Sequence, residues 1–97
     1  MVSETPIITD ITQLRQYVYE NLCHQNDFEP GAFQITERVL LRSGAPCGIL
    51  FCLHGPRNVK LNAIWEAEQN HVFFYGSTGR RTHQTRLSAG PSLTVNL

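Results

Sequence analysis

The spacing of the apolar residues changes once along the chain, and this change sets the order of its secondary structure. Between residues 10 and 25 apolar side chains recur at helical spacing, at Ile11, Leu14, Val18 and Leu22. Such a stripe predicts an amphipathic helix that covers one surface. Asp10 and Gln13 have the spacing of a capping box at its start, and Pro30-Gly31 breaks the chain after it.

From Phe33 onwards the apolar pattern has a period of two or is continuous, which indicates strands. Turn-forming residues separate four such runs, at about 33–42, 47–53, 59–67 and 71–75, from one another and from a last β-compatible run at 80–87. The connections are short, so neighbouring runs should pair as hairpins. The last run is polar, as suits an exposed edge. We therefore predict an α+β fold, with an N-terminal helix packed on one face of a four- or five-stranded antiparallel meander sheet.

The length of 97 residues and the apolar fraction of 41% are those of one globular domain. We expect an N-terminal arm over 1–9, the helix over 10–25, the sheet over 33–87 and a tail over 88–97 that could add a strand. No signal peptide or membrane-spanning stretch is evident. Cys23, Cys47 and Cys52 are odd in number and do not form a disulfide pattern. We expect a cytoplasmic protein with reduced thiols and no membrane contact.

The charges are divided between the two halves of the chain. Residues 1–37 hold six acidic residues and one basic residue, whereas residues 38–97 hold two acidic and seven basic residues. Such polarity can steer a partner or favour association between unlike faces. It is equally compatible with an ordinary helix beside an ordinary sheet.

Apolar residues fall on both faces of the predicted sheet, although a single helix can cover only one. The second face collects Leu40, Leu50, Cys52 and Ile64, together with either Phe73 and Tyr75 or Phe74. Uncovered apolar patches commonly mark interfaces. We take as candidate interface residues Leu40, Leu50, Ile64, Phe73 and Tyr75, and we expect a homodimer packed sheet against sheet or around the sheet rim. The alternative is that loops, arm and tail cover this face.

The cysteine and histidine residues do not have the spacing of a metal site or a catalytic centre. Cys52 and His54 share a strand face, but two ligands do not close a zinc site. As a catalytic pair, Cys52 would be the nucleophile and His54 the base, with Glu37 on the next strand as a third group. Residues two apart on a strand are too far from each other for the hydrogen bond that such a pair needs. We expect no metal, no cofactor and no catalytic residue.

The segment Gly76–Arg81 combines two glycines with two arginines. Glycine N–H groups can converge on an anion, and arginines can hold it. The candidate anion or nucleic-acid contacts are Arg57, Lys60, Arg80, Arg81 and Arg86, with Trp65, Phe73 and Tyr75 as possible stacking surfaces. A plain hairpin turn with a soluble edge explains the same residues.

Several short segments resemble one known group of proteins. They are Leu14–Val18, Asn21–Cys23, Pro46–Gly48, His54–Arg57 and Phe74–Arg80. They look like a small hypothetical bacterial protein family of planctomycete type, over nearly the whole chain to Leu87. The resemblance implies a stand-alone bacterial protein of this size and transfers no functional residue.

Three functions remain open from the sequence. The leading one is a small non-enzymatic interaction or regulatory module, homodimeric, that binds an unidentified protein partner through the outer sheet face or the arginine-rich hairpin. The second is an anion or nucleic-acid binder. The third is a small-molecule enzyme with a pocket between helix and sheet, which would show convergent polar groups.

Overall fold

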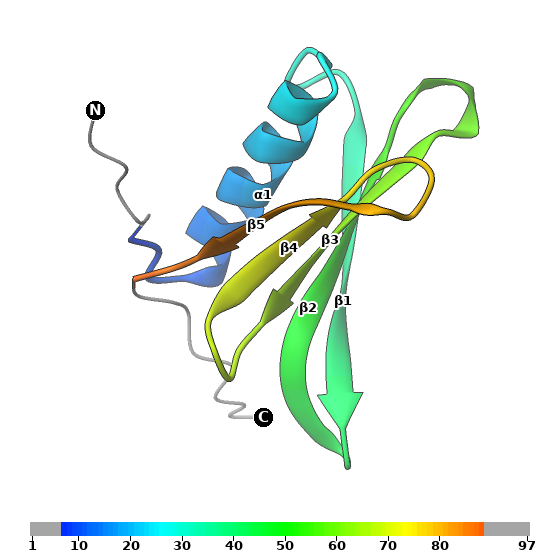
Figure 1. Ribbon diagram of the computed structural model, residues 1–97. Helices are drawn as coiled ribbons and strands as arrows, with labels where there is room; N and C mark the ends of the chain where they lie inside the picture. Colours follow the sequence, from blue (N-terminus) through cyan, green and yellow to red (C-terminus); the bar gives the residue numbers. More distant parts are fainter. Residues whose placement is uncertain (1–6, 89–97) are drawn as a thin grey trace.

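In the computed structural model, which describes residues 7–88, one helix packs against one face of a five-stranded antiparallel sheet (Figure 1). The elements are α1 (Ile11–Gln25), β1 (Gln34–Arg42), β2 (Ala45–His54), β3 (Lys60–Glu66), β4 (His71–Tyr75) and β5 (Arg81–Arg86). The strands lie in chain order and each pairs with the next, which confirms the predicted α+β meander. The tail after residue 88, where the sequence leaves an additional strand open, and most of the N-terminal arm lie outside the described residues.

The start of α1 is capped much as the sequence predicts. The Asp10 carboxylate accepts a hydrogen bond from the backbone N–H of Gln13 at 2.8 Å, which satisfies one of the free amides of the first turn. The Gln13 side chain reaches back one residue further than in a capping box, because its Oε1 accepts from the backbone N–H of Thr9 at 2.8 Å. No helix among residues 7–88 is long and apolar enough to cross a membrane.

The core lies between α1 and the face of the sheet that the helix covers. Leu14, Val18 and Leu22 form the buried stripe of the helix. The sheet contributes alternate residues of three central strands, namely Ile49, Phe51, Leu53, Leu61, Ala63, Trp65, Val72 and Phe74. Burial of this apolar surface is the main force that holds helix and sheet together.

The turn between β3 and β4 is joined to the end of β5 by Asn70. The buried indole Nε1 of Trp65 donates to Asn70 Oδ1 at 2.9 Å, and Asn70 Nδ2 donates to the carbonyl of Leu87 at 3.2 Å. The backbone N–H of Leu87 donates to the Asn70 carbonyl at 2.8 Å. Asn70 has a φ of 54°, in the left-handed region that asparagine tolerates better than most residues.

The helix is too short to cover the whole sheet. Its contacts are concentrated on β2 and β3, and the far end of the β1–β2 hairpin extends past it (Figure 1). Val39 and Leu41 lie on the helix side of β1 but are 48% and 64% exposed. The apolar alternation of β1 therefore does not produce a covered face along the full strand.

Candidate interaction surface

The face of the sheet turned away from α1, here called the outer face, carries five neighbouring apolar side chains. Leu50 of β2 pairs with Ile64 of β3, and Ile64 pairs with Phe73 of β4, so the three form one row across the sheet. Tyr75 and Leu40 lie on the same face in the adjacent rows. We call Leu40, Leu50, Ile64, Phe73 and Tyr75 the apolar centre. All five are half-buried by their neighbours.

The two aromatic sets of β4 are now assigned to faces. Phe73 and Tyr75 point to the outer face, whereas Phe74 is buried on the helix side. The structure has one α-helix among residues 7–88, and that helix lies on the other face. Ile8, the buried residue of the arm, also belongs to the helix-side core. The sequence analysis leaves open that the tail covers the outer face, and the tail after residue 88 lies outside the described residues.

A shallow hollow of about 440 Å³ lies within the outer face. Leu50, Ile64 and Tyr75 supply its apolar lining, Gly79 lines it from the β4–β5 turn, and Asn62 is its polar member. The Asn62 side chain makes no hydrogen bond within residues 7–88. An amide there has two donors and an acceptor free for a ligand.

Planar side chains stack along β4 at the border of the apolar centre. The rings of His71 and Phe73 are parallel within 7°, with centroids 5.0 Å apart. The Arg81 guanidinium lies 4.4 Å from the centroid of Phe73 and 5.9 Å from that of Tyr75. Cation–π attraction of this kind holds the guanidinium in place over the outer face.

Four basic residues without an ion pair within residues 7–88 surround the apolar centre, while Arg42, which alternation also places on the outer face at the end of β1, is paired with Glu68. Arg38 of β1 lies beside Leu50, Lys60 is at the start of β3, and Arg86 of β5 lies beside His71. We call Arg38, Lys60, Arg81 and Arg86 the basic rim, and all four are exposed. Glu66 is the one acidic residue of the strands on this face. The two ion pairs among the described residues, Arg15–Glu37 and Arg42–Glu68, do not involve the rim.

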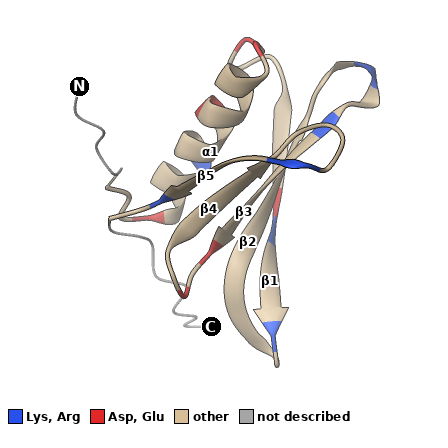
Figure 2. Cartoon of the chain, viewed as in Figure 1, with Lys and Arg blue, Asp and Glu red and all other residues tan. Residues whose placement is uncertain are grey.

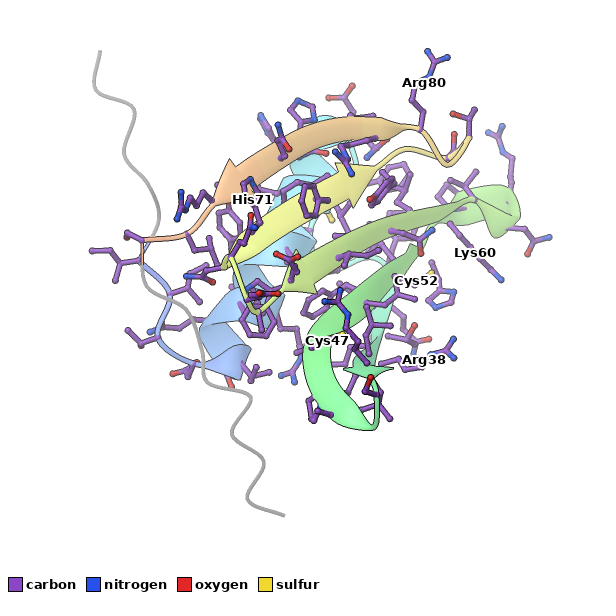
Figure 3. The ribbon with its side chains drawn as sticks, turned by 60° about the horizontal axis from the view of Figure 1, so that its bottom comes forward. Arg38, Cys47, Cys52, Lys60, His71 and Arg80 are labelled. Carbon is purple, nitrogen blue, oxygen red and sulfur yellow. The ribbon has the colours of Figure 1, made fainter. Side chains whose placement is uncertain are left out.

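Of the candidate contacts taken from the sequence, Lys60, Arg81 and Arg86 belong to the basic rim. Arg38 is not among those candidates, although the alternation of β1 places it on the same face as Leu40, which is a candidate interface residue. Arg57 and Arg80 lie in the two turns at one end of the sheet, and Arg80 projects away from the strands (Figure 3). Arg86 is at the opposite end of β5.

The β4–β5 turn uses its glycine amides internally. The backbone N–H of Gly76 donates to the carbonyl of Arg80 at 2.9 Å, and that of Gly79 donates to the carbonyl of Gly76 at 3.0 Å. These amides close the hairpin and do not point together at an anion. Trp65 does not provide a stacking surface on the outer face, because it is buried on the helix side.

The possible catalytic trio of Cys52, His54 and Glu37 is not assembled. His54 Nε2 lies 2.9 Å from the hydroxyl of Thr36 on the outer face. Glu37 is on the helix side, where Arg15 holds its carboxylate through two hydrogen bonds of 2.6 and 2.9 Å. Within residues 7–88 no group of three histidine, cysteine or carboxylate side chains is placed to bind a metal.

The enzyme hypothesis predicts a pocket between helix and sheet. The structure has a groove of about 310 Å³ there, lined by residues of α1 and by Phe33 and Ile35. Its charged group, Arg15, is already paired with Glu37. This hydrogen bonding lowers the pKa of Glu37 and raises that of Arg15. Burial raises the pKa of the Cys23 thiol in the core. These groups stabilise the fold and do not converge on a substrate position.

The two sides of the molecule differ in charge. Four acidic residues lie on α1, at its start or in the loop after it, where Arg15 is the one basic residue, while the remaining basic residues lie on the strands and turns of the sheet together with Glu37, Glu66 and Glu68 (Figure 2). The division seen along the sequence thus becomes an excess of acidic residues around the helix and of basic residues on the sheet.

No family model matches the chain, and neither a curated protein nor a solved structure shows significant similarity to it. The resemblance to a bacterial family stays a prediction.

Proposed function

We propose that this protein is a small non-catalytic interaction module, and that its outer face binds an anionic partner. The observation that carries the proposal is the composition of this face, in which an apolar centre is surrounded by four cations and one carboxylate. A half-exposed apolar surface favours contact with a partner. The unpaired cations of the rim select the sign of its charge.

The predicted homodimer is a less favourable occupant of the same face. Two outer faces packed against each other would bring two basic rims together, and like charges across an interface oppose association. Self-association therefore stays a prediction. The mass of the protein in solution by light scattering, over a range of concentrations, measures it directly.

The proposal is tested with immobilised heparin and polyglutamate as generic polyanions. We expect salt-sensitive retention of the native protein. Ile64→Asp places a carboxylate in the apolar centre, and Val39→Asp places the same charge on the helix side of β1, at a residue that is already 48% exposed. Retention should fall much more for Ile64→Asp than for Val39→Asp, with unchanged circular dichroism for both variants. Equal retention of the two variants, or failure of the native protein to bind any polyanion at low salt, would refute the proposal.

A further inference from the structure

We infer that the anionic partner is a single-stranded nucleic acid that crosses the outer face between β5 and β1, with its bases against the apolar centre. This inference rests on the proposed function, because it names the partner of the same surface. Three features of the face carry it: the row of planar groups on β4, the hollow beside Tyr75, and the division of the basic rim between the two edges of the sheet.

The planar groups favour nucleobases over other anionic partners. His71, Phe73, Arg81 and Tyr75 form a row of flat side chains. Unpaired bases stack on aromatic rings and on arginine guanidinium planes. An acidic peptide has carboxylates for the rim but lacks flat groups to match this row.

The hollow beside Tyr75 supplies the second feature. Leu50 and Ile64 give it an apolar lining, and Asn62 offers unused hydrogen-bonding groups at its border. Asparagine amides pair with the edges of bases, whose own donors and acceptors lie in the ring plane. A base inserted here would contact apolar atoms with its face and Asn62 with its edge.

The basic rim is placed for phosphates on both sides of such a base. Arg38 is on the edge strand β1, and Arg81 and Arg86 are on the edge strand β5. Four strand spacings of about 4.8 Å separate the two edges by about 19 Å. Arginine binds phosphate oxygens with two parallel hydrogen bonds. A strand crossing the sheet would therefore meet a guanidinium at each edge.

A double helix does not fit this arrangement. Its bases are paired and stacked inside, so it would present only its backbone to the apolar centre. The inference thus predicts a preference for single strands over a duplex of equal length. It names no contact with the ribose 2′-hydroxyl, so oligouridine and oligothymidine are both suitable probes.

The experiment measures the anisotropy of fluorescein-labelled 12-nucleotide oligouridine and oligothymidine with the full chain at several salt concentrations. Four rim cations predict a slope of about −3 for log K against log salt concentration, at about −0.7 per phosphate contact. Arg38→Gln should make this slope shallower by about 0.7. Its matched control is Arg42→Gln on the same strand, because Arg42 already faces Glu68 at 3.9 Å; this variant should change the slope less.

A second pair of variants tests the contact with the bases. Tyr75→Leu keeps an apolar side chain but removes the ring, and should weaken binding at least about fivefold. Phe28→Leu makes a comparable change on the helix side, where Phe28 contacts Phe33, and should leave binding within twofold. Circular dichroism and thermal melting establish that each variant is folded before its affinity is compared.

The outcomes separate this inference from the proposed function. Preferential binding of single strands that depends on Tyr75 supports both. If heparin and polyglutamate bind as tightly as the oligonucleotides, or if an equal-length duplex does, the inference is overturned and the proposed function stands. An unchanged affinity in Tyr75→Leu overturns the inference in the same way. If no polyanion binds at low salt, both are overturned.

Discussion

The strongest structural test concerns Asn70, because one side chain there performs three separate tasks. It accepts from the buried indole of Trp65, donates to the carbonyl of Leu87 and tolerates a φ of 54°. Asn70→Ala removes all three at once. Trp65 is 1% exposed, so its N–H would lose its partner where water has little access.

The cost of Asn70→Ala can be estimated from these contributions. A buried donor left without a partner costs about 1–3 kcal/mol, and a lost hydrogen bond to Leu87 about 0.5–1.5 kcal/mol. Alanine in the left-handed region adds about 1 kcal/mol. The free energy of unfolding should therefore fall by about 3–5 kcal/mol. For a domain of this size the melting temperature should fall by at least about 12 °C.

The measurement is urea unfolding followed by far-ultraviolet circular dichroism and by the fluorescence of Trp65, the single tryptophan of the chain. Asn70→Gly is the informative companion, because it loses the same side-chain bonds without the left-handed strain. It should be about 1 kcal/mol more stable than Asn70→Ala. A loss below about 1 kcal/mol for Asn70→Ala, or equal stability of the two variants, would show that this reasoning is incorrect.

Two further changes test the fold. Glu37→Gln should lower stability by about 0.5–1 kcal/mol at pH 7, a modest value because the Arg15–Glu37 pair is partly exposed to solvent. The hydrogen bonds from Arg15 lower the pKa of Glu37 in the folded state, so its contribution to stability is present above the unfolded pKa and disappears as the pH falls through the folded pKa. The urea midpoints of the native and Glu37→Gln proteins should therefore differ at pH 7 and converge in acid, with Glu29→Gln as a control that changes little. In Gly48→Ala the new Cβ would collide with the backbone carbonyl oxygen of Trp65, and we expect a loss of about 2 kcal/mol or more by thermal melting. In Gly76→Ala the new Cβ would come no closer than 3.3 Å to another group, the Thr82 methyl, so this variant should lose much less stability, and equal losses for the two glycines would contradict the packing argument.

Much of the architecture follows from local signals in the sequence. The helical stripe from Ile11 to Leu22 and the Asp10 cap define α1. Short turns between the strands favour pairing of each strand with the next one in the chain. The faces of β4 were not predictable, because His71–Tyr75 is apolar or aromatic at nearly every position. The burial of Phe74 beneath α1 decides between the two aromatic sets.

The placement of Arg81 shows a second limit of pattern analysis. Strict alternation would put Arg80, Thr82, Gln84 and Arg86 on one face. A register irregularity between Phe74 and Tyr75 instead pairs Tyr75 with Arg81, so that Arg81 joins Gln84 and Arg86 on the outer face. An irregularity of this kind shifts one residue out of the ladder, and nothing in the residue types of β5 indicates where it falls.

The position of the helix has a consequence for how the chain acquires its structure. α1 is made before the strands of the sheet, yet it packs chiefly on β2 and β3, which emerge later. An isolated helix of 15 residues is only marginally stable in water. The hairpins, whose partners are adjacent in sequence, can assemble by local steps. α1 therefore leaves the ribosome before its packing surface has been made, and the core can close only once β2 and β3 are both available to it.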